Sequence, residues 1–128
     1  MNGIKKLLVI DDDKSICALL KLKLENTGRY QVDYALDAGS GMAIAMADKP
    51  DLIILDIMMP DLQGGDLAHI LSENPATQDI PVIFWSSLVP EDALKSRGGM
   101  IGGLPMVSKS SDLSELKSRI DGMLADTA

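Results

Sequence analysis

The sequence has little cysteine, few aromatic residues and no long apolar run. Its single cysteine, Cys17, cannot close an internal disulfide, which excludes the small secreted domains that disulfides hold together. No apolar run approaches the roughly 20 residues that a membrane-spanning helix needs, and the four apolar residues after Lys6 are too few for a secretory signal. We therefore expect a soluble protein in a reducing cytoplasm, with no membrane partner.

Basic side chains are also scarce. The chain has 12 Lys and Arg against 19 Asp and Glu, a net charge of −7. Nucleic acids and anionic membranes attract basic surfaces, so this balance argues against direct binding to either. What the chain does have is 46% apolar residues in a length of 128, which suits one domain with a hydrophobic core. We predict a single domain over residues 1–128.

Short apolar runs recur along the chain at wide spacing. Most of them lack the alternation of a half-buried strand, which is typical of parallel strands covered on both faces. One run alternates, as an edge strand would. The predicted strands, with the alternating one second, are 7–10, 31–35, 52–55, 82–85 and 104–107.

Helical patterns separate these runs. The first has apolar residues at spacings of three and four, and a glycine beyond it that can end the helix: Ile16, Leu19, Leu20, Leu24 and then Gly28. The third helical pattern places Leu67, Ile70 and Leu71 on one side of the predicted helix. Four glycines within 98–103 leave little regular helix there, since each costs roughly 1 kcal/mol in a helix. We predict helices over 15–26, 39–48, 65–73, 90–97 and 111–125.

The alternation of strand and helix predicts an α/β fold. Right-handed crossovers between parallel strands place helices on both faces of one sheet. Five such strands suit a single doubly wound, flavodoxin-like sheet in the order 2-1-3-4-5.

Acidic residues follow two of the central strands. Asp11, Asp12 and Asp13 end the first strand and Asp56 ends the third, and ligands of such sheets bind beyond the carboxyl ends of the strands. Two carboxylates about 5 Å apart repel by roughly 3 kcal/mol at an effective dielectric of 20. A proton or a hard divalent cation such as Mg²⁺ would relieve this repulsion. The alternative is that 11–13 only caps the first helix, but Asp56 at the same sheet edge favours a metal pocket.

Four motifs in order resemble the response-regulator receiver domain of two-component signalling. They are Leu8-Val9-Ile10-Asp11-Asp12-Asp13, then Asp56-Ile57-Met58-Met59-Pro60 with Gly64, then Pro81-Val82-Ile83 leading to Ser86, and then Lys109. The similarity covers about residues 5–124. It implies a phosphoprotein of the chemotaxis-regulator type that catalyses only its own phosphorylation and dephosphorylation, and is otherwise not an enzyme.

The resemblance also implies a role for each matching acidic residue. Asp56 matches the aspartate that accepts a phosphoryl group and also contacts the metal. Asp12 matches the direct Mg²⁺ ligand, and Asp11 matches its neighbour, which acts through water. Met58 would offer its backbone carbonyl to the metal.

Two further residues match groups that neutralise the phosphoryl oxygens. Ser86 matches the Ser/Thr whose hydroxyl donates to one of these oxygens, although a strand shifted by one residue would place Ser87 inward instead. Lys109 matches the lysine that pairs with the acceptor carboxylate or with the phosphoryl group. It could otherwise be an ordinary solvated lysine near a helix start.

The resemblance implies that phosphorylation switches the partner-binding face formed by 90–97, 104–107 and 111–125. The chain departs from the family in the glycine-rich stretch 98–103 beside this face and at two single positions. Ser110 stands where a proline, often with a cis bond, usually follows the lysine, so a trans bond is expected here. Met106 stands where an aromatic ring usually rotates on phosphorylation. Both changes leave open an alternative in which the domain signals without phosphorylation.

Two other functions remain alternatives. A haloacid-dehalogenase-like phosphatase would use Asp11 as its nucleophile within Asp11-x-Asp13, but the chain has no room for a cap insertion. A flavin-binding flavodoxin would need phosphate-binding hydroxyls where the three acids stand, and the chain is only 3% aromatic. As a receiver, its partners would be a sensor histidine kinase or phosphotransfer protein, and an unidentified output protein or domain.

Overall fold

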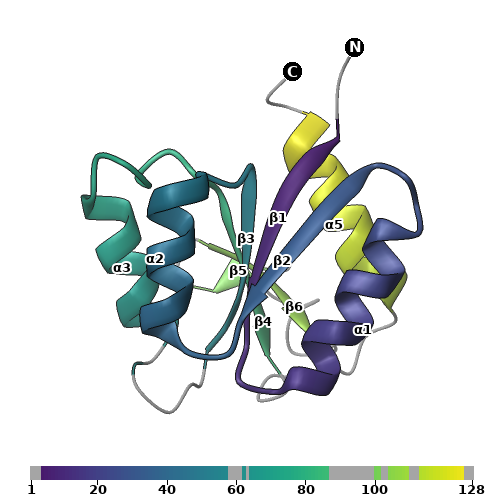
Figure 1. Ribbon diagram of the computed structural model, residues 1–128, viewed down its shortest axis with the longest axis horizontal. Helices are drawn as coiled ribbons and strands as arrows, with labels where there is room; N and C mark the ends of the chain where they lie inside the picture. The colour runs from purple at the N-terminus through teal and green to yellow at the C-terminus, as the bar shows by residue number, and fades with distance from the viewer. Residues whose placement is uncertain are drawn as a thin grey trace.

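The computed structural model describes residues 4–57, 62, 64–86, 100–101, 104–109 and 113–125. Strands and helices alternate along most of this chain (Figure 1). The strands are β1 (Lys5–Ile10), β2 (Tyr30–Ala35), β3 (Leu52–Asp56), β4 (Val82–Ser86), β5 (Met100–Ile101) and β6 (Leu104–Ser108). The helices are α1 (Lys14–Glu25), α2 (Ala38–Asp48), α3 (Gly64–Glu73) and α5 (Leu113–Ala125). Within these residues no helix is long and apolar enough to cross a bilayer.

The strands form one sheet in the order β2-β1-β3-β4-β6-β5. The first five of these pair in parallel, which confirms the predicted flavodoxin-like order 2-1-3-4-5 of the parallel strands. The alternating strand, β2, lies at an edge as predicted. The short β5 was not predicted, and it pairs antiparallel with β6 through Met100–Pro105 and Ile101–Leu104. Two residues among glycines are too few to show a strand period.

Helices cover both faces of the sheet (Figure 1). Residues that alternate along β1 point to opposite faces, so Leu7 and Val9 pack into one core cluster and Leu8 and Ile10 into the other. The first cluster includes residues of α1 and α5, and the second includes residues of α2 and α3. Burial on both faces explains why the central strands read as continuous apolar runs.

Aspartates begin the first two helices. The Asp13 carboxylate accepts hydrogen bonds from the Ser15 and Ile16 amides at 2.9 and 3.3 Å, and Asp37 accepts one from the Ser40 amide at 2.7 Å. Gly28, with φ of 79°, adopts the left-handed conformation after α1, as its position predicted. The fourth predicted helix, 90–97, lies outside the described residues.

Two residues of the apolar helical spacings are exposed. Leu19 on α1 keeps 48% of its surface accessible and Ile70 on α3 keeps 38%. The apolar stripe of each helix is therefore wider than the part of the helix that the sheet covers.

Polar contacts hold α5 beside the start of β2. The Tyr30 hydroxyl donates a hydrogen bond to the Asp121 carboxylate. The same carboxylate forms ion pairs with the Arg29 guanidinium at 3.0 Å and with Lys117 Nζ at 3.2 Å. Partial burial raises the pKa of Asp121, but the hydrogen bonds from Tyr30 and Lys117 and the charge of Arg29 outweigh it and hold this pKa below its usual value. Burial and the bond to Asp121 raise the pKa of Tyr30 to about 12. The position of α5 on the sheet therefore depends partly on charge.

Gly41 allows α2 to lie directly against β1. A methyl group at this position would sit 2.6 Å from Ile10 Cδ1 and 2.8 Å from Ile10 Cγ1. We expect Gly41→Ala to lower the free energy of unfolding by about 1–3 kcal/mol, because the buried isoleucine has little room to move. Urea unfolding of the purified variant would measure this change.

Gly122→Ala in α5 is the matched control, since nothing beyond its chain neighbours and the backbone of its own helix lies within 4 Å of the added methyl group. In a helix this change normally stabilises by roughly 0.5–1 kcal/mol. If both variants gained stability, the close packing of α2 on β1 would be refuted.

Candidate functional site

The carboxyl ends of β1 and β3 bring three aspartates together. Ile10 pairs with Leu55, so the next residues, Asp11 and Asp56, lie level at the edge of the sheet. Asp11, Asp12 and Asp56 each offer a carboxylate oxygen, and these atoms all lie within 4.8 Å of one another. Asp11 is fully buried and Asp56 is 7% exposed, whereas Asp12 faces solvent. The predicted cluster of carboxylates is therefore present.

Four contacts hold Asp11 in place. Its backbone N–H donates to the Ala35 carbonyl at 3.1 Å, and its own carbonyl accepts from the Cys17 thiol at 3.3 Å. One carboxylate oxygen accepts from the Asp13 amide at 2.9 Å, and the other accepts from Lys109 Nζ at 2.6 Å. These contacts fix the position of the Asp11 carboxylate, whereas Asp12 is the more accessible acid.

The Cys17 thiol is part of this support. Cys17 lies on α1 and is fully buried in the core cluster, where it packs as a small apolar residue. Burial, together with the charges of Asp11 and Asp13, raises its pKa to about 12. It therefore stays a protonated thiol and can donate its hydrogen bond at any physiological pH. The sequence offered no signal for this contact, which depends on the turn from β1 into α1.

The capping alternative holds for one of the three consecutive acids. Asp13 caps α1, since its carboxylate accepts from the Ser15 and Ile16 amides. Asp11 and Asp12 instead share the cluster with Asp56. The run of three acids thus divides between a structural cap and a pocket.

Lys109 supplies the positive charge of the site. It follows β6, and its backbone N–H donates to the Ser86 carbonyl at 2.7 Å. Its Nζ lies 2.6 Å from Asp11 Oδ2 and 3.7 Å from Asp56 Oδ1, with only 13% of the side chain exposed. The solvated-lysine alternative is therefore wrong. The resemblance paired Lys109 with the acceptor carboxylate, whereas the shorter contact here is with Asp11.

Ser86 ends β4 beside these residues. It is 1% exposed, and it lies one position beyond the Asp56–Trp85 pair and opposite Ser108 of β6. Ser108 is also 1% exposed; it follows the predicted strand 104–107 and was not among the predicted site residues. Met58, Ser87 and Ser110 lie outside the described residues, so the expectations for them stay predictions.

The donor set suits a hard divalent cation. Among the described residues, three carboxylates face one ammonium, which leaves two negative charges in a small and partly buried space. Oxygen ligands without nitrogen or sulfur favour Mg²⁺ or Ca²⁺ over zinc or copper. The residues present therefore fit the metal that the sequence predicts.

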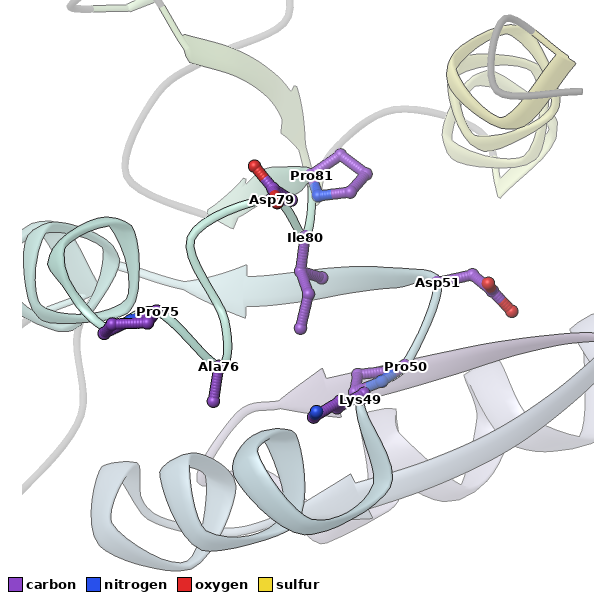
Figure 2. Close-up of a pocket in the computed structure, with 8 residues that line it drawn as sticks. All are labelled: Lys49, Pro50, Asp51, Pro75, Ala76, Asp79, Ile80 and Pro81. Atoms are coloured by element: carbon purple, nitrogen blue, oxygen red, sulfur yellow. The ribbon is translucent and has the colours of Figure 1, made fainter.

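A hollow of about 320 Å³ lies at the amino ends of the strands, opposite the acidic site (Figure 2). The loops before β3 and β4 form it, with Ile80 pointing toward its middle. Its Asp51 carboxylate is already engaged, since it accepts the Lys6 amide at 2.8 Å. Lys49 and Asp79 add single charges of opposite sign. This hollow lacks the convergent carboxylates of the acidic site.

Comparison with known families matches residues 7–121 to the response regulator receiver domain. The chain belongs to this family. In sequence, this receiver is 34% identical to the DNA-binding dual master transcriptional regulator RpaA of Synechocystis sp., over 95% of this chain and 50% of RpaA. It is 37% identical to the response regulator PleD of Caulobacter vibrioides, over 77% of this chain and 20% of PleD. The receiver thus spans half or less of the length of these curated relatives.

Solved receiver structures have the same fold. The Francisella response regulator 1452 receiver domain superimposes with a TM-score of 0.80 at 30% identity, covering 97% of this chain and 99% of that one. A CheY-like response regulator receiver domain protein from Methanospirillum hungatei gives 0.81 at 25% identity, covering 97% and 96%. Membership of this family explains the acidic cluster and excludes the flavodoxin alternative.

Metal binding should compete with Lys109. The ammonium shares Asp11 with any cation that enters the cluster. We expect Mg²⁺ to raise the melting temperature of the receiver, because a ligand that binds only the folded form stabilises it. In Lys109→Met the competing charge is gone, so we expect the Kd for Mg²⁺ to fall by roughly tenfold, about 1.4 kcal/mol. Calorimetric titration with MgCl₂ measures both affinities.

Lys117→Met on α5 is the control for loss of a lysine far from the acids, and it should bind Mg²⁺ as the unchanged receiver does. Melting that stays constant across millimolar Mg²⁺ would contradict the metal pocket. Equal affinities in the unchanged protein and Lys109→Met would contradict competition for Asp11.

Proposed function

We propose that this chain is the phosphoacceptor receiver of a two-component system and that Asp56 takes the phosphoryl group with the help of Mg²⁺. We include residues 1–128 in this one receiver and place it in the cytoplasm. The supporting observation is that Asp11, Asp12, Asp56 and Lys109 gather at one sheet edge of a member of this family. Of these acids, Asp56 is the one at the end of β3, which lies between β1 and β4 in the sheet.

Asp56 would act as the nucleophile. One of its carboxylate oxygens forms a bond to phosphorus, and the bond from phosphorus to the leaving group of the donor breaks. Negative charge spreads over the three other phosphoryl oxygens as this happens. Lys109 is already 3.7 Å from Asp56, so its charge is in place before the phosphoryl group arrives. Ser86 would donate its hydroxyl hydrogen to one of these oxygens.

Asp11, Asp12, Asp56 and the Met58 carbonyl would hold the metal. When bound, Mg²⁺ supplies positive charge to the phosphoryl oxygens and relieves the repulsion among the acids. The groups that stabilise the transferring phosphoryl group thus all belong to the receiver or to its metal. The donor would need to deliver only the phosphoryl group, which is why the receiver catalyses its own modification without being an enzyme toward other substrates.

The phosphatase alternative would use Asp11 instead. Both Asp11 carboxylate oxygens are engaged, one by the Asp13 amide and one by Lys109, and the residue is fully buried. Asp56 is 7% exposed and so is more accessible to a donor. Asp56 is therefore the better nucleophile of the two.

Switching in this receiver would not use an aromatic ring on β6. Met106 is 2% exposed and packs in the core cluster with Phe84, its partner in the strand register. Phosphorylation would therefore act through the ends of β4 and β6 and the face that β6 and α5 share with the fourth predicted helix. A receiver that signals without phosphorylation is the remaining alternative.

Incubation with acetyl phosphate and MgCl₂ tests the function. We expect the intact mass to rise by one phosphoryl group in the unchanged protein and to stay constant in Asp56→Asn, which lacks the nucleophilic carboxylate. Asp11→Asn keeps Asp56 and should still be labelled, at a reduced rate. Label that persists in Asp56→Asn and disappears in Asp11→Asn would favour the phosphatase alternative. Folded protein that takes up no label would favour signalling without phosphorylation.

A protein donor would dock beside the acidic pocket. α1 starts directly after Asp13 and exposes Leu19 and Leu22, with 48% and 65% of their surfaces accessible. The same helix carries Lys14 and Lys23, both exposed, on a chain whose net charge is −7. This local combination of apolar and basic groups suits an acidic helical surface of a histidine kinase or phosphotransfer protein.

Leu22→Glu should separate docking from chemistry. We expect phosphotransfer from a histidine-phosphorylated protein that labels the unchanged receiver to slow by about tenfold, since a charge would be placed in the contact, equivalent to about 1.4 kcal/mol. Labelling by acetyl phosphate should not change. Ile70→Glu on α3, another exposed apolar residue, is the control and should leave both rates unaltered. If only Ile70→Glu slowed phosphotransfer, the docking surface would be on α3 and the proposed surface on α1 would be wrong.

A further inference from the structure

Trp85 lies in the sheet directly beside the phosphoacceptor strand. It pairs with Asp56 of β3 on one side and with Val107 of β6 on the other. Its ring belongs to the core cluster that includes residues of α1 and α5, and only 5% of its surface is exposed. It is also the only tryptophan of the chain.

The indole N–H of Trp85 has no hydrogen-bond acceptor. Among the residues that the structure describes, Nε1 of Trp85 is the one buried side-chain nitrogen or oxygen without a partner. Buried polar groups are normally satisfied, and an unsatisfied one calls for a reason. Leucine or phenylalanine would fill an apolar core without this loss. Leaving this buried N–H without an acceptor costs free energy equivalent to a factor of about 5 to 150 in the ratio of two conformations.

The backbone around Trp85 connects it to the site. The next residue, Ser86, accepts the Lys109 backbone N–H at 2.7 Å, and the Lys109 ammonium contacts Asp11 and Asp56. Any shift of Ser86 or Lys109 toward a phosphoryl group on Asp56 would displace the strand ends on both sides of the indole. Packed cores change between discrete arrangements, so such a shift can alter which acceptors reach the indole.

We propose that the Trp85 indole N–H is a donor left unsatisfied in the unphosphorylated receiver and satisfied by an oxygen acceptor once Asp56 is phosphorylated. The lost hydrogen bond then raises the free energy of the unphosphorylated conformation only. Trp85 thereby favours the phosphorylated conformation from inside the core. This inference rests on the proposed phosphorylation of Asp56.

The single tryptophan gives a direct test by nuclear magnetic resonance. The ¹⁵N-labelled receiver has one indole N–H signal, which we would record free, with Mg²⁺, and with Mg²⁺ and beryllium trifluoride, a mimic of the phosphoryl group on a carboxylate. We expect the proton signal to move downfield and its exchange with solvent to slow only in the last state. A magnetization-transfer signal from water would identify water as the acceptor, and its absence would indicate a backbone carbonyl.

An isosteric substitution tests the energetic part. Replacing Trp85 by the benzothiophene analogue of tryptophan puts sulfur in place of the N–H and keeps the two-ring shape. We expect the unphosphorylated protein to melt at a higher temperature and to bind beryllium trifluoride about 5- to 150-fold more weakly. Trp85→Phe should show the same weaker binding, although it also removes volume. Phe84→Leu removes volume from the other core cluster and should lower stability without changing that affinity.

The outcomes separate this inference from the proposed function. An indole signal that stays unchanged while beryllium trifluoride binds, or an analogue that binds it with unaltered affinity, overturns the role of Trp85 and leaves Asp56 as the acceptor. A receiver that binds no beryllium trifluoride and takes no label from acetyl phosphate overturns both.

Discussion

The structure depends on holding like charges together at the ends of two neighbouring strands. Because β1 and β3 are parallel and in register, Asp11 and Asp56 must emerge level at the same sheet edge. Their repulsion is offset by Lys109, which comes from the far end of the chain and contacts both. One ammonium does not neutralise three carboxylates, so the folded protein retains a demand for positive charge at this point. That demand is the chemical basis of the metal binding and the phosphoryl transfer that we propose.

The rest of the fold makes this arrangement rigid. Core clusters on both faces of the sheet fix the strands, and the contact of Gly41 with Ile10 sets the distance of α2 from β1. The Asp13 cap and the Cys17 thiol fix the turn that carries Asp11 and Asp12. Preorganisation of this kind is what electrostatic stabilisation requires, since groups already in position need no reorganisation during the reaction.

The β4–β6 side of the sheet differs from the β1–β3 side. Met106 replaces an aromatic residue, and β5 adds an antiparallel strand at the outer edge of β6. Trp85 is buried between β3 and β6, and no acceptor within the described part of the chain reaches its indole N–H. A short outer strand also covers the backbone groups of β6, which would otherwise be open to pairing with another chain. These features distinguish this side of the sheet from the acidic β1–β3 side.

Local patterns in the chain were enough to predict the order of the parallel strands, four helices and the meeting of Asp11, Asp12 and Asp56, because strand period, helix spacing and crossover handedness are local or general constraints. They did not reveal β5, whose two residues show no period, or the exposure of Leu19 and Ile70, which depends on how much of each helix the sheet covers. The closer pairing of Lys109 with Asp11 and the missing acceptor of Trp85 were equally invisible. Such contacts join residues far apart in sequence, and only the packing of β6 and α5 against the other strands decides which atoms come within reach.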